Sequence, residues 1–210
     1  MQIKLFDTND IENKLKTRPL YEGCFDEGKN DFIDYYYDRI IRRNQIVVAE
    51  EEGKILSMIH LNPYFYNICG EVHRVHYLVA IATSKEYRNR GLMSKIMNFS
   101  IEYLKSLQDP FCYIVPECKE YEIMYGKYGF SSVCKFTLDK FSKDKYDIFP
   151  DDNPEYRELM NMEQYFLDLE SEDYKSELSK KMVLFRILNE NVMMSIEELR
   201  KKSIYVCQEV

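Results

Sequence analysis

The 210-residue sequence lacks the marks of several large classes of protein. No stretch is apolar enough to span a bilayer, and the N-terminus has no basic patch leading into an apolar run, as a signal peptide would. A net charge of −7 excludes a whole-molecule basic surface for nucleic acid. Internal repeats and low-complexity tracts are also missing. We therefore expect a cytoplasmic globular protein that binds neither membranes nor nucleic acids.

Cysteine and histidine are few and poorly spaced for a metal site. None of the six cysteines forms a Cys-x-x-Cys pair, and the three histidines add no metal-ligand spacing. His73 and His76 lie three residues apart on a predicted strand, where alternation turns their side chains to opposite faces. These patterns predict reduced, mostly buried thiols, structural or surface histidines, and no bound metal.

Composition is ordinary for an α/β domain with a real core, at 45% hydrophobic and 31% charged residues. The negative charge is unevenly placed, because residues 151–180 hold ten acids and three bases while the other residues sum to zero. This acidic segment is typical of a solvated helix surface. A composition shift predicts a domain boundary near residue 145, with a domain over residues 1–145 and an appendage over 146–210.

Hydrophobic periodicity predicts alternating strands and helices along the chain. Gly53 favours a hairpin turn, and Asn62-Pro63 is expected to interrupt the strand that returns from it. Strands are predicted at residues 2–6, 45–50, 55–61, 64–69, 72–83, 111–115 and 130–138, and helices at 10–20, 31–43, 90–107 and 117–127. In the appendage, the pattern predicts an acidic helix at 153–170, a run at 181–188 that is strand or helix, a capping box at 195–198 and a strand at 204–207.

The segment AIATSKEYRNRGLMSKIM, residues 80–97, is the most informative part of the sequence. A buried strand ends near Thr83, a short polar loop follows, and a helix begins near Arg90. Gly91 allows a ligand to approach the backbone closely, and the first N–H groups of the helix favour an anion. Arg88 and Arg90 flank this turn, so the segment favours a pyrophosphate. A plain strand-to-helix corner with exposed arginines explains the same residues about as well.

A second motif, YEIMYGKYGF, occupies residues 121–130. Together with YRNRGLM about 35 residues earlier, it resembles the two signature regions of the GCN5-related N-acetyltransferase (GNAT) superfamily. Arg88, Gly91 and Met93 match its Arg/Gln-x-x-Gly-x-Gly/Ala motif for acyl-CoA, although Met93 stands where the family has a small residue. Tyr125 and the Gly-Phe pair at 129–130 match its Tyr-x-x-x-Gly-Phe ending. The resemblance covers residues 1 to about 140.

Within the superfamily, the chain is most similar to the N-terminal domain of enhanced-intracellular-survival acetyltransferases. The HLNPY segment at residues 60–64 and the Pro after the fifth strand carry this likeness. The resemblance implies a mixed, mostly antiparallel central sheet flanked by helices, with a small C-terminal α/β appendage. It also implies transfer of an acetyl group from acetyl-CoA to a primary amine of a small molecule or peptide, by direct attack in a ternary complex and without a metal.

The resemblance assigns roles to particular residues. Tyr125 is the implied general acid that protonates the departing CoA thiolate. The general base stays open among Glu71, Glu117, Glu120 and the C-terminal carboxylate of Val210. Pantetheine is expected to bond to the backbone at the end of the central strand, as an added strand does. The acyl-CoA residues implied are Ile81, Ala82, Thr83, Arg88, Asn89, Arg90, Gly91, Leu92, Met93 and Ser94.

Alternatives remain at the level of function. Tyr35, Tyr36, Tyr37, Tyr64 and Tyr66 fall on elements that wall the acceptor side in this superfamily, but core and rim packing explains them slightly better. The acceptor is a small amine or a lysine tail of a protein. A different class of function is a non-catalytic acyl-CoA-binding module whose acidic tail forms a partner or dimer surface. A homodimer is compatible with either reading.

Overall fold

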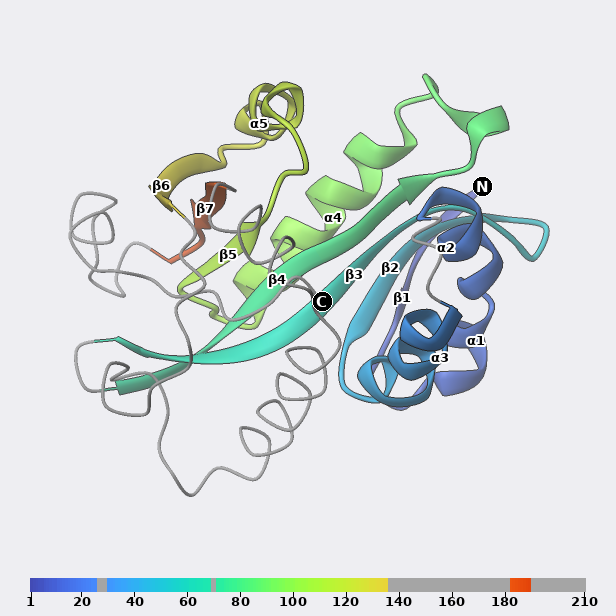
Figure 1. The fold of residues 1–210 in the computed structure, drawn as a ribbon, viewed down its shortest axis with the longest axis horizontal. Helices are drawn as coiled ribbons and strands as arrows, with labels where there is room; N and C mark the ends of the chain where they lie inside the picture. Colours follow the sequence, from blue (N-terminus) through green and yellow to red (C-terminus); the bar gives the residue numbers. More distant parts are fainter. Residues whose placement is uncertain (26–29, 69–70, 136–181, 190–210) are drawn as a thin grey trace. The chain divides into compact units, whose positions relative to one another are not determined.

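The computed structural model describes residues 1–25, 30–68, 71–135 and 182–189 (Figure 1). The chain divides into two compact units. Residues Met1–Pro63 and His76–Gln108 belong to the first, and residues Tyr64–Val75 together with the described residues from Asp109 onward belong to the second. Each unit combines antiparallel strands with helices that pack on them, so the predicted α/β fold with mostly antiparallel strands flanked by helices is confirmed.

Four strands lie side by side in the first unit, in the order β1-β2-β3-β4. Neighbours β1 and β2 are antiparallel, as are β2 and β3. The hairpin between β2 and β3 turns at Glu52 and Gly53, whose φ angles of 51° and 81° form the tight turn that matches strand twist. The predicted positive φ of Gly53 is therefore confirmed. The strands are β1 (Gln2–Phe6), β2 (Gln45–Glu51), β3 (Lys54–Ile68) and β4 (Glu71–Thr83), the last two continuing into the second unit.

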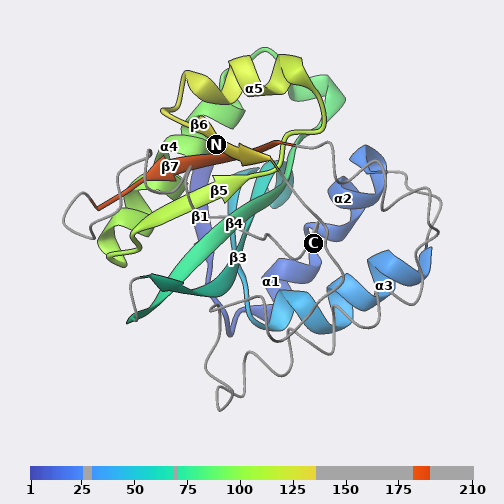
Figure 2. The same cartoon turned by 60° about the vertical axis from the view of Figure 1, so that its left-hand side comes forward.

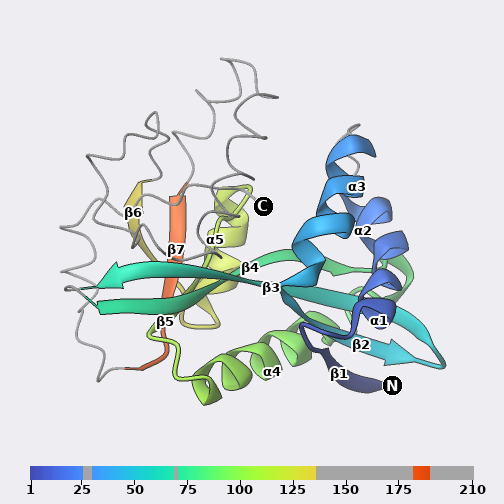
Figure 3. The ribbon, with the colours of Figure 1, turned by 90° about the horizontal axis from the view of Figure 1, so that it is seen from below.

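Helices cover both faces of these strands. Figure 3 shows α4 on one side and α1, α2 and α3 on the other. Helix α4 packs against β1 and β2 through a buried stripe that includes Ile96, Met97 and Leu104, and α1 packs against β1. The helices are α1 (Ile11–Leu15), α2 (Arg18–Cys24), α3 (Asn30–Arg39) with a 3₁₀ turn η1 (Ile40–Arg42), and α4 (Leu92–Ser106).

The single helix predicted over residues 10–20 is wrong, because the chain breaks between α1 and α2. Pro19 lies in the first turn of α2, where its missing N–H costs nothing. In the middle of one long helix, the same proline would remove a backbone hydrogen bond and clash with the preceding turn. The Thr17 hydroxyl donates to the Lys14 carbonyl at 2.7 Å and so satisfies an acceptor at the break.

The predicted interruption at Asn62-Pro63 is also wrong, because β3 runs through both residues. The ladder between β2 and β3 ends at the pair Gln45 and Leu61. Pro63 lies beyond that last pair, so its missing N–H removes no bond to β2.

The second unit contains a strand from the predicted appendage. Figure 2 shows β7 (Met182–Ile187) between β5 (Phe111–Ile114) and β6 (Ser131–Lys135). It pairs antiparallel with both neighbours, so the run at 181–188 is a strand. The Phe185 ring packs on Phe111 and Tyr113 with centroids 5.2 and 5.7 Å away. Helix α5 (Lys119–Gly126) packs against β6.

Several predictions lie outside the described residues: the boundary near residue 145, the acidic helix, the capping box and the strand at 204–207. Among the described cysteines, which are free thiols, Cys112 is buried, Cys24 half-buried and Cys118 exposed. No helix in the described ranges is long and apolar enough to cross a membrane.

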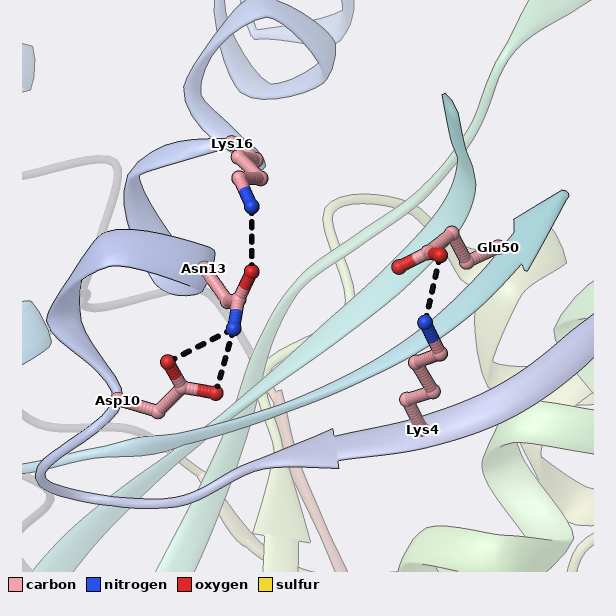
Figure 4. A network of polar contacts seen from close by, with 5 residues as sticks. All are labelled: Lys4, Asp10, Asn13, Lys16 and Glu50. Atoms are coloured by element: carbon pink, nitrogen blue, oxygen red, sulfur yellow. Dashed lines mark hydrogen bonds and ion pairs between the residues drawn. The ribbon is translucent and has the colours of Figure 1, made fainter. Parts of the chain in front are cut away.

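Polar contacts at the start of the chain tie neighbouring segments together (Figure 4). Lys4 Nζ lies 2.6 Å from Glu50 Oε1 and links β1 to β2. The Asn13 amide donates to Asp10 at 2.9 Å and accepts from Lys16 Nζ at 2.6 Å, along α1. The first two contacts are part-buried and the Lys16 contact is exposed, and surface contacts of this kind contribute little stability each.

A polar cluster is buried between α3 and β3. The Tyr36 hydroxyl lies 2.9 Å from His60 Nδ1 and donates to Asn62 Oδ1 at 3.2 Å, and the Asn44 amide donates to the same oxygen at 3.0 Å. All four side chains are buried. Burial, with a smaller effect from the charge of Lys14, lowers the pKa of His60 from 6.5 to about 3. The imidazole is therefore neutral in the folded protein at any pH near neutrality.

The neutral His60 makes stability depend on pH. Because its folded pKa lies below its unfolded value, the unfolded state gains a proton first as pH falls from 6.5 toward 3. Between pH 7 and pH 5, we expect this group alone to lower the free energy of unfolding by about 2 kcal/mol. Urea titrations at both pH values check this, with His60→Gln expected to lose about 2 kcal/mol less than wild type over the interval.

Tyr36→Phe is the matched control, since it removes a hydroxyl from the same cluster but keeps the imidazole. It is expected to lower stability at both pH values and to retain the wild-type pH dependence. An unchanged pH dependence in His60→Gln would show that His60 is not held neutral by the fold.

Candidate functional site

The connection from β4 to α4 forms the first candidate site. After Thr83 the chain makes one 3₁₀ turn, η2 (Lys85–Tyr87), and then passes through two residues with left-handed backbone. These are Asn89 at φ 61° and Gly91 at φ 71°. Arg88 is exposed between them and η2, and its Nε donates to the Thr83 carbonyl at 3.2 Å. A short connection thus places two arginines and a helix start at the end of a buried strand.

Gly91 is the N-cap of α4, which starts later than the predicted Arg90. A Cβ built on Gly91 meets nothing within 4 Å, so packing inside the chain does not require a glycine there. Its left-handed φ does, and the open space above the backbone leaves room for a ligand. The amides of Leu92 and Met93 lie in the first turn and have no intrahelical acceptor, and across the described residues no side chain caps this helix end. The first helical bond runs from the Lys95 amide to the Gly91 carbonyl at 3.2 Å.

The end of β4 is held by the first residues of β3. The Ser57 hydroxyl donates to the Ala82 carbonyl at 2.8 Å and lies 2.8 Å from Thr83 Oγ1. The Ser84 amide donates to the Leu56 carbonyl at 2.9 Å. These bonds fix where β4 stops and hence where the following turn begins.

Ala80 is a feature of β4 that sequence reasoning missed. Its φ of 50° is left-handed, which is rare for a non-glycine residue inside a strand and locally disturbs the alternation of side chains. Alanine carries no sequence signal for such a conformation. The distortion lies directly before Ile81, the first residue of the predicted acyl-CoA set.

The apolar pattern of α4 predicts an inner stripe of six residues, of which four are buried: Met97, Ser100, Ile101 and Leu104. The other two, Met93 and Leu107, are half-buried, while Leu92 and Ile96 are buried instead. The Met93 side chain is therefore not wholly taken up by the core.

Tyr125 lies in the second unit, on α5. Its side chain is only 7% exposed, and its ring lies 6.4 Å from that of Tyr121 and 6.3 Å from that of Phe130. Burial raises the pKa of its hydroxyl, and nearby Tyr121 and Cys118 raise it further. The phenol therefore stays protonated at neutral pH, as a proton donor must.

Gly129 in the same motif is favoured by its backbone, because its φ of 79° is left-handed. An added Cβ would also lie 2.9 Å from Nη1 of Arg186 on β7, the far end of a flexible side chain that can move away. The sequence predicts the turn but not the arginine, because Arg186 lies far away along the chain.

The candidate bases differ in environment. Glu117 and Glu120 are exposed near the start of α5. A hydrogen bond from the backbone amide of Glu120 itself, and a second from the Cys118 side chain, lower the pKa of Glu120 and make it a weaker base. The Glu71 side chain and Val210 lie outside the described residues.

The predicted acceptor-wall tyrosines are mostly core residues. Tyr36, Tyr37 and Tyr64 are buried, and Tyr35 is half-buried. The Tyr37 hydroxyl lies 2.9 Å from Thr17 Oγ1, inside the unit. The packing interpretation is therefore confirmed for the buried three, while the Tyr66 side chain lies outside the described residues.

Metal chemistry has no obvious ligand set in the described part of the chain. No group of three or more His, Cys, Asp or Glu side chains there is arranged to hold a metal ion. His60 and His76 are buried, and His73 is half-buried.

Several solved structures with a similar fold are described as acetyl- or acyltransferases. Aminoglycoside 6'-acetyltransferase type Ii aligns with a TM-score of 0.57 and 12% identity over 90% of this chain and 98% of its own. An acyl-CoA N-acyltransferase from Pseudomonas aeruginosa aligns with a TM-score of 0.54 and 15% identity over 88% and 98%. A probable N-acyltransferase from Enterococcus faecalis V583 aligns with a TM-score of 0.53 and 17% identity, over 62% of this chain and 32% of its own.

At these identities the likeness shows the fold alone, and the chain spans about a third of the Enterococcus protein. No curated protein sequence matches the chain. The family model described as "Acetyltransferase (GNAT) domain" matches residues 12–133, which is more than half of the chain and includes both the Gly91 turn and the Tyr125 helix. The chain therefore belongs to the GNAT acetyltransferase family.

Proposed function

We propose that this protein is an acetyl-CoA-dependent N-acetyltransferase whose acceptor is a primary amine on a small molecule or a peptide. The observation that carries the proposal is the start of α4, where Gly91 has a left-handed φ and open space at its Cβ beside the first amides of the helix. Family membership supports acetyl transfer as the reaction class. The acceptor beyond a primary amine is not part of the proposal.

The start of α4 is suited to the diphosphate of acetyl-CoA. Its first amides and the positive end of the helix dipole attract an anion, and Arg88 adds charge-assisted donors, with Arg90 close by on the other side of Asn89. Pantetheine is proposed to run along the backbone of Ile81–Thr83 and to bond to it as an added strand does. Asn89 shapes the turn, while Leu92, Met93 and Ser94 supply amides at the helix start.

The chemistry is a single displacement at the thioester. The neutral amine forms the new C–N bond to the acetyl carbon, and the C–S bond to CoA breaks with its electron pair on sulfur. The amine loses a proton to a base, and the thiolate takes a proton from the Tyr125 hydroxyl. Much of the rate would come from holding amine and thioester together.

The base remains a choice among Glu71, Glu117, Glu120 and Val210, acting directly or through water. The lowered pKa of Glu120 makes it less suited to hold a proton at neutral pH than an unpaired carboxylate. Glu117 is exposed and lies two residues before α5 begins.

We also propose a branch within the family, domain bounds, a location and an oligomeric state. The HLNPY segment in β3 supports the N-terminal domain of enhanced-intracellular-survival acetyltransferases as the nearest branch. A catalytic domain over residues 1–145, an appendage over 146–210, cytoplasmic action and a homodimer complete the proposal.

Gly91→Ala tests the binding half of the proposal, with Gly53→Ala as its match. Both glycines have positive φ and open space at Cβ, so each alanine is expected to cost about 1 kcal/mol of stability. Only Gly91→Ala should place a methyl group over the diphosphate. Calorimetric titration with acetyl-CoA is expected to show about a tenfold or greater loss of affinity for Gly91→Ala and no more than about a twofold change for Gly53→Ala. Equal acetyl-CoA affinities of the two variants would show that the diphosphate does not bind at this turn.

Release of CoA thiol in the presence of a panel of amines tests the transfer half. We expect at least one primary amine to raise thiol release above the hydrolysis seen without amine. With that amine, Tyr125→Phe is expected to lower kcat at least about tenfold while changing acetyl-CoA affinity little, because the hydroxyl acts only on the leaving sulfur.

Tyr121→Phe and Tyr128→Phe are the controls, since both tyrosines lie within three or four residues of Tyr125. A loss of turnover in either, with Tyr125→Phe active, would reassign the acid. Tight acetyl-CoA binding with no amine-dependent release would favour the second candidate, a non-catalytic acyl-CoA-binding module with a partner- or dimer-forming tail. The half-buried Met93 at the helix start is the observation behind that candidate.

A further inference from the structure

Two cations converge on one aromatic ring beside the start of α4. The Arg90 guanidinium carbon lies 4.9 Å from the centre of the Tyr87 ring, and Lys54 Nζ lies 5.0 Å from it. Tyr87 comes from η2 and Arg90 from the turn before α4, whereas Lys54 comes from the β2–β3 hairpin. We call these three residues the Tyr87 cluster. Both cations are exposed, so their charged groups face solvent.

The segment that carries Tyr87 and Arg90 is basic in a protein with a net charge of −7, while the hairpin before Lys54 carries the carboxylates of Glu51 and Glu52. Residues 84–91 contain three cations and one carboxylate, and Lys54 brings a fourth cation from outside the segment. That carboxylate, Glu86, lies 3.4 Å from Lys54 Nζ, and both groups are more than half exposed. Tyr87 and Glu86 raise the pKa of Lys54, so it is charged at neutral pH.

The diphosphate does not account for this surplus. The α4 amides and Arg88 already offer donors and positive charge to a diphosphate above Gly91. Tyr87 and Arg90 lie before the first residue of α4, in the connection from β4, and Lys54 lies at the start of β3. CoA carries a second anion, the 3′-phosphomonoester on its ribose, with a charge of about −1.5 to −2 at neutral pH.

We propose that the Tyr87 cluster binds the 3′-phosphate of CoA and selects CoA over dephospho-CoA. The inference rests on the proposed function, because it places a second phosphate of the same ligand next to the diphosphate. Arg90 contributes a planar donor fork suited to a phosphate, and Lys54 a point charge. When the 3′-phosphate binds, it replaces Glu86 as the ion-pair partner of Lys54.

Tyr87 acts as the positioning residue. Long arginine and lysine side chains lose rotamer entropy when they are ordered on a ligand. Contact with the face of an aromatic ring holds both cations in advance, which lowers that loss. Tyr87 itself carries no charge, so its contribution is separable from long-range electrostatics.

The test is the ratio of dissociation constants for dephospho-CoA and CoA, measured by calorimetry on the full chain. The wild type is expected to bind CoA at least about tenfold more tightly. Arg90→Gln and Lys54→Gln are each expected to lower the ratio at least about threefold, and the double variant to bring it near one. Lys105→Gln, an exposed lysine near the other end of α4, should keep the wild-type ratio.

Two substitutions of Tyr87 separate positioning from charge. Tyr87→Leu leaves every charge in place but removes the ring, and is expected to lower the ratio at least about threefold. Tyr87→Phe keeps the ring and is expected to restore most of the ratio. Circular dichroism at the titration temperature confirms that each variant is folded.

The outcomes separate the 3′-phosphate site from acyl-CoA binding itself. Equal affinity of the wild type for CoA and dephospho-CoA overturns the 3′-phosphate site and leaves acyl-CoA binding intact. An unchanged ratio in Arg90→Gln, Lys54→Gln and Tyr87→Leu assigns the 3′-phosphate to other residues and also overturns it. Failure of both ligands to bind overturns the proposed function and the inference together.

Discussion

The reversal of the backbone at Gly91 is the constraint around which the candidate site is built. On one side, bonds from Ser57 and Leu56 fix the end of β4. On the other, buried Leu92, Ile96 and Met97 fix α4 against the strands. The chain must join these two fixed points within a few residues, and it does so with left-handed φ at Asn89 and Gly91. The amides of Leu92 and Met93 have no acceptor within α4, and no side chain in the described ranges caps this end of the helix.

Local sequence predicts most of this arrangement. The buried strand, the polar loop, the glycine and the amphipathic helix are all consecutive, and each has a strong pattern of its own. Gly53 and the hairpin are predicted for the same reason. Alternation of apolar residues also locates β1, and a continuous apolar run locates β5, each to within a residue.

The features that sequence missed depend on contacts between distant segments. The Tyr87 cluster needs Lys54 from a hairpin more than 30 residues away, and Arg186 meets Gly129 only because β7 pairs with β6. Tyr36 and Tyr37 look like binding residues by type, yet His60, Asn62 and Thr17 give their hydroxyls partners inside the core. Ala80 adopts a left-handed φ that alanine does not signal.

Binding and transfer rest on different parts of the chain. The first unit holds the turn, the first amides of α4 and the basic residues beside them, so the proposed acyl-CoA site is formed by residues close together in the chain. The second unit holds Tyr125, whose buried and protonated hydroxyl has the property that an acid needs. The family model matches residues 12–133 and therefore includes both motifs.

Amide hydrogen exchange, followed residue by residue by NMR with and without CoA, tests the central claim most directly. Amides without acceptors exchange quickly, and a bound diphosphate gives them acceptors. We expect the amides of Leu92 and Met93 to become strongly protected when CoA binds, with little change at the far end of α4. Saturating CoA binding that leaves these two amides unprotected would contradict the assignment of the diphosphate to this turn.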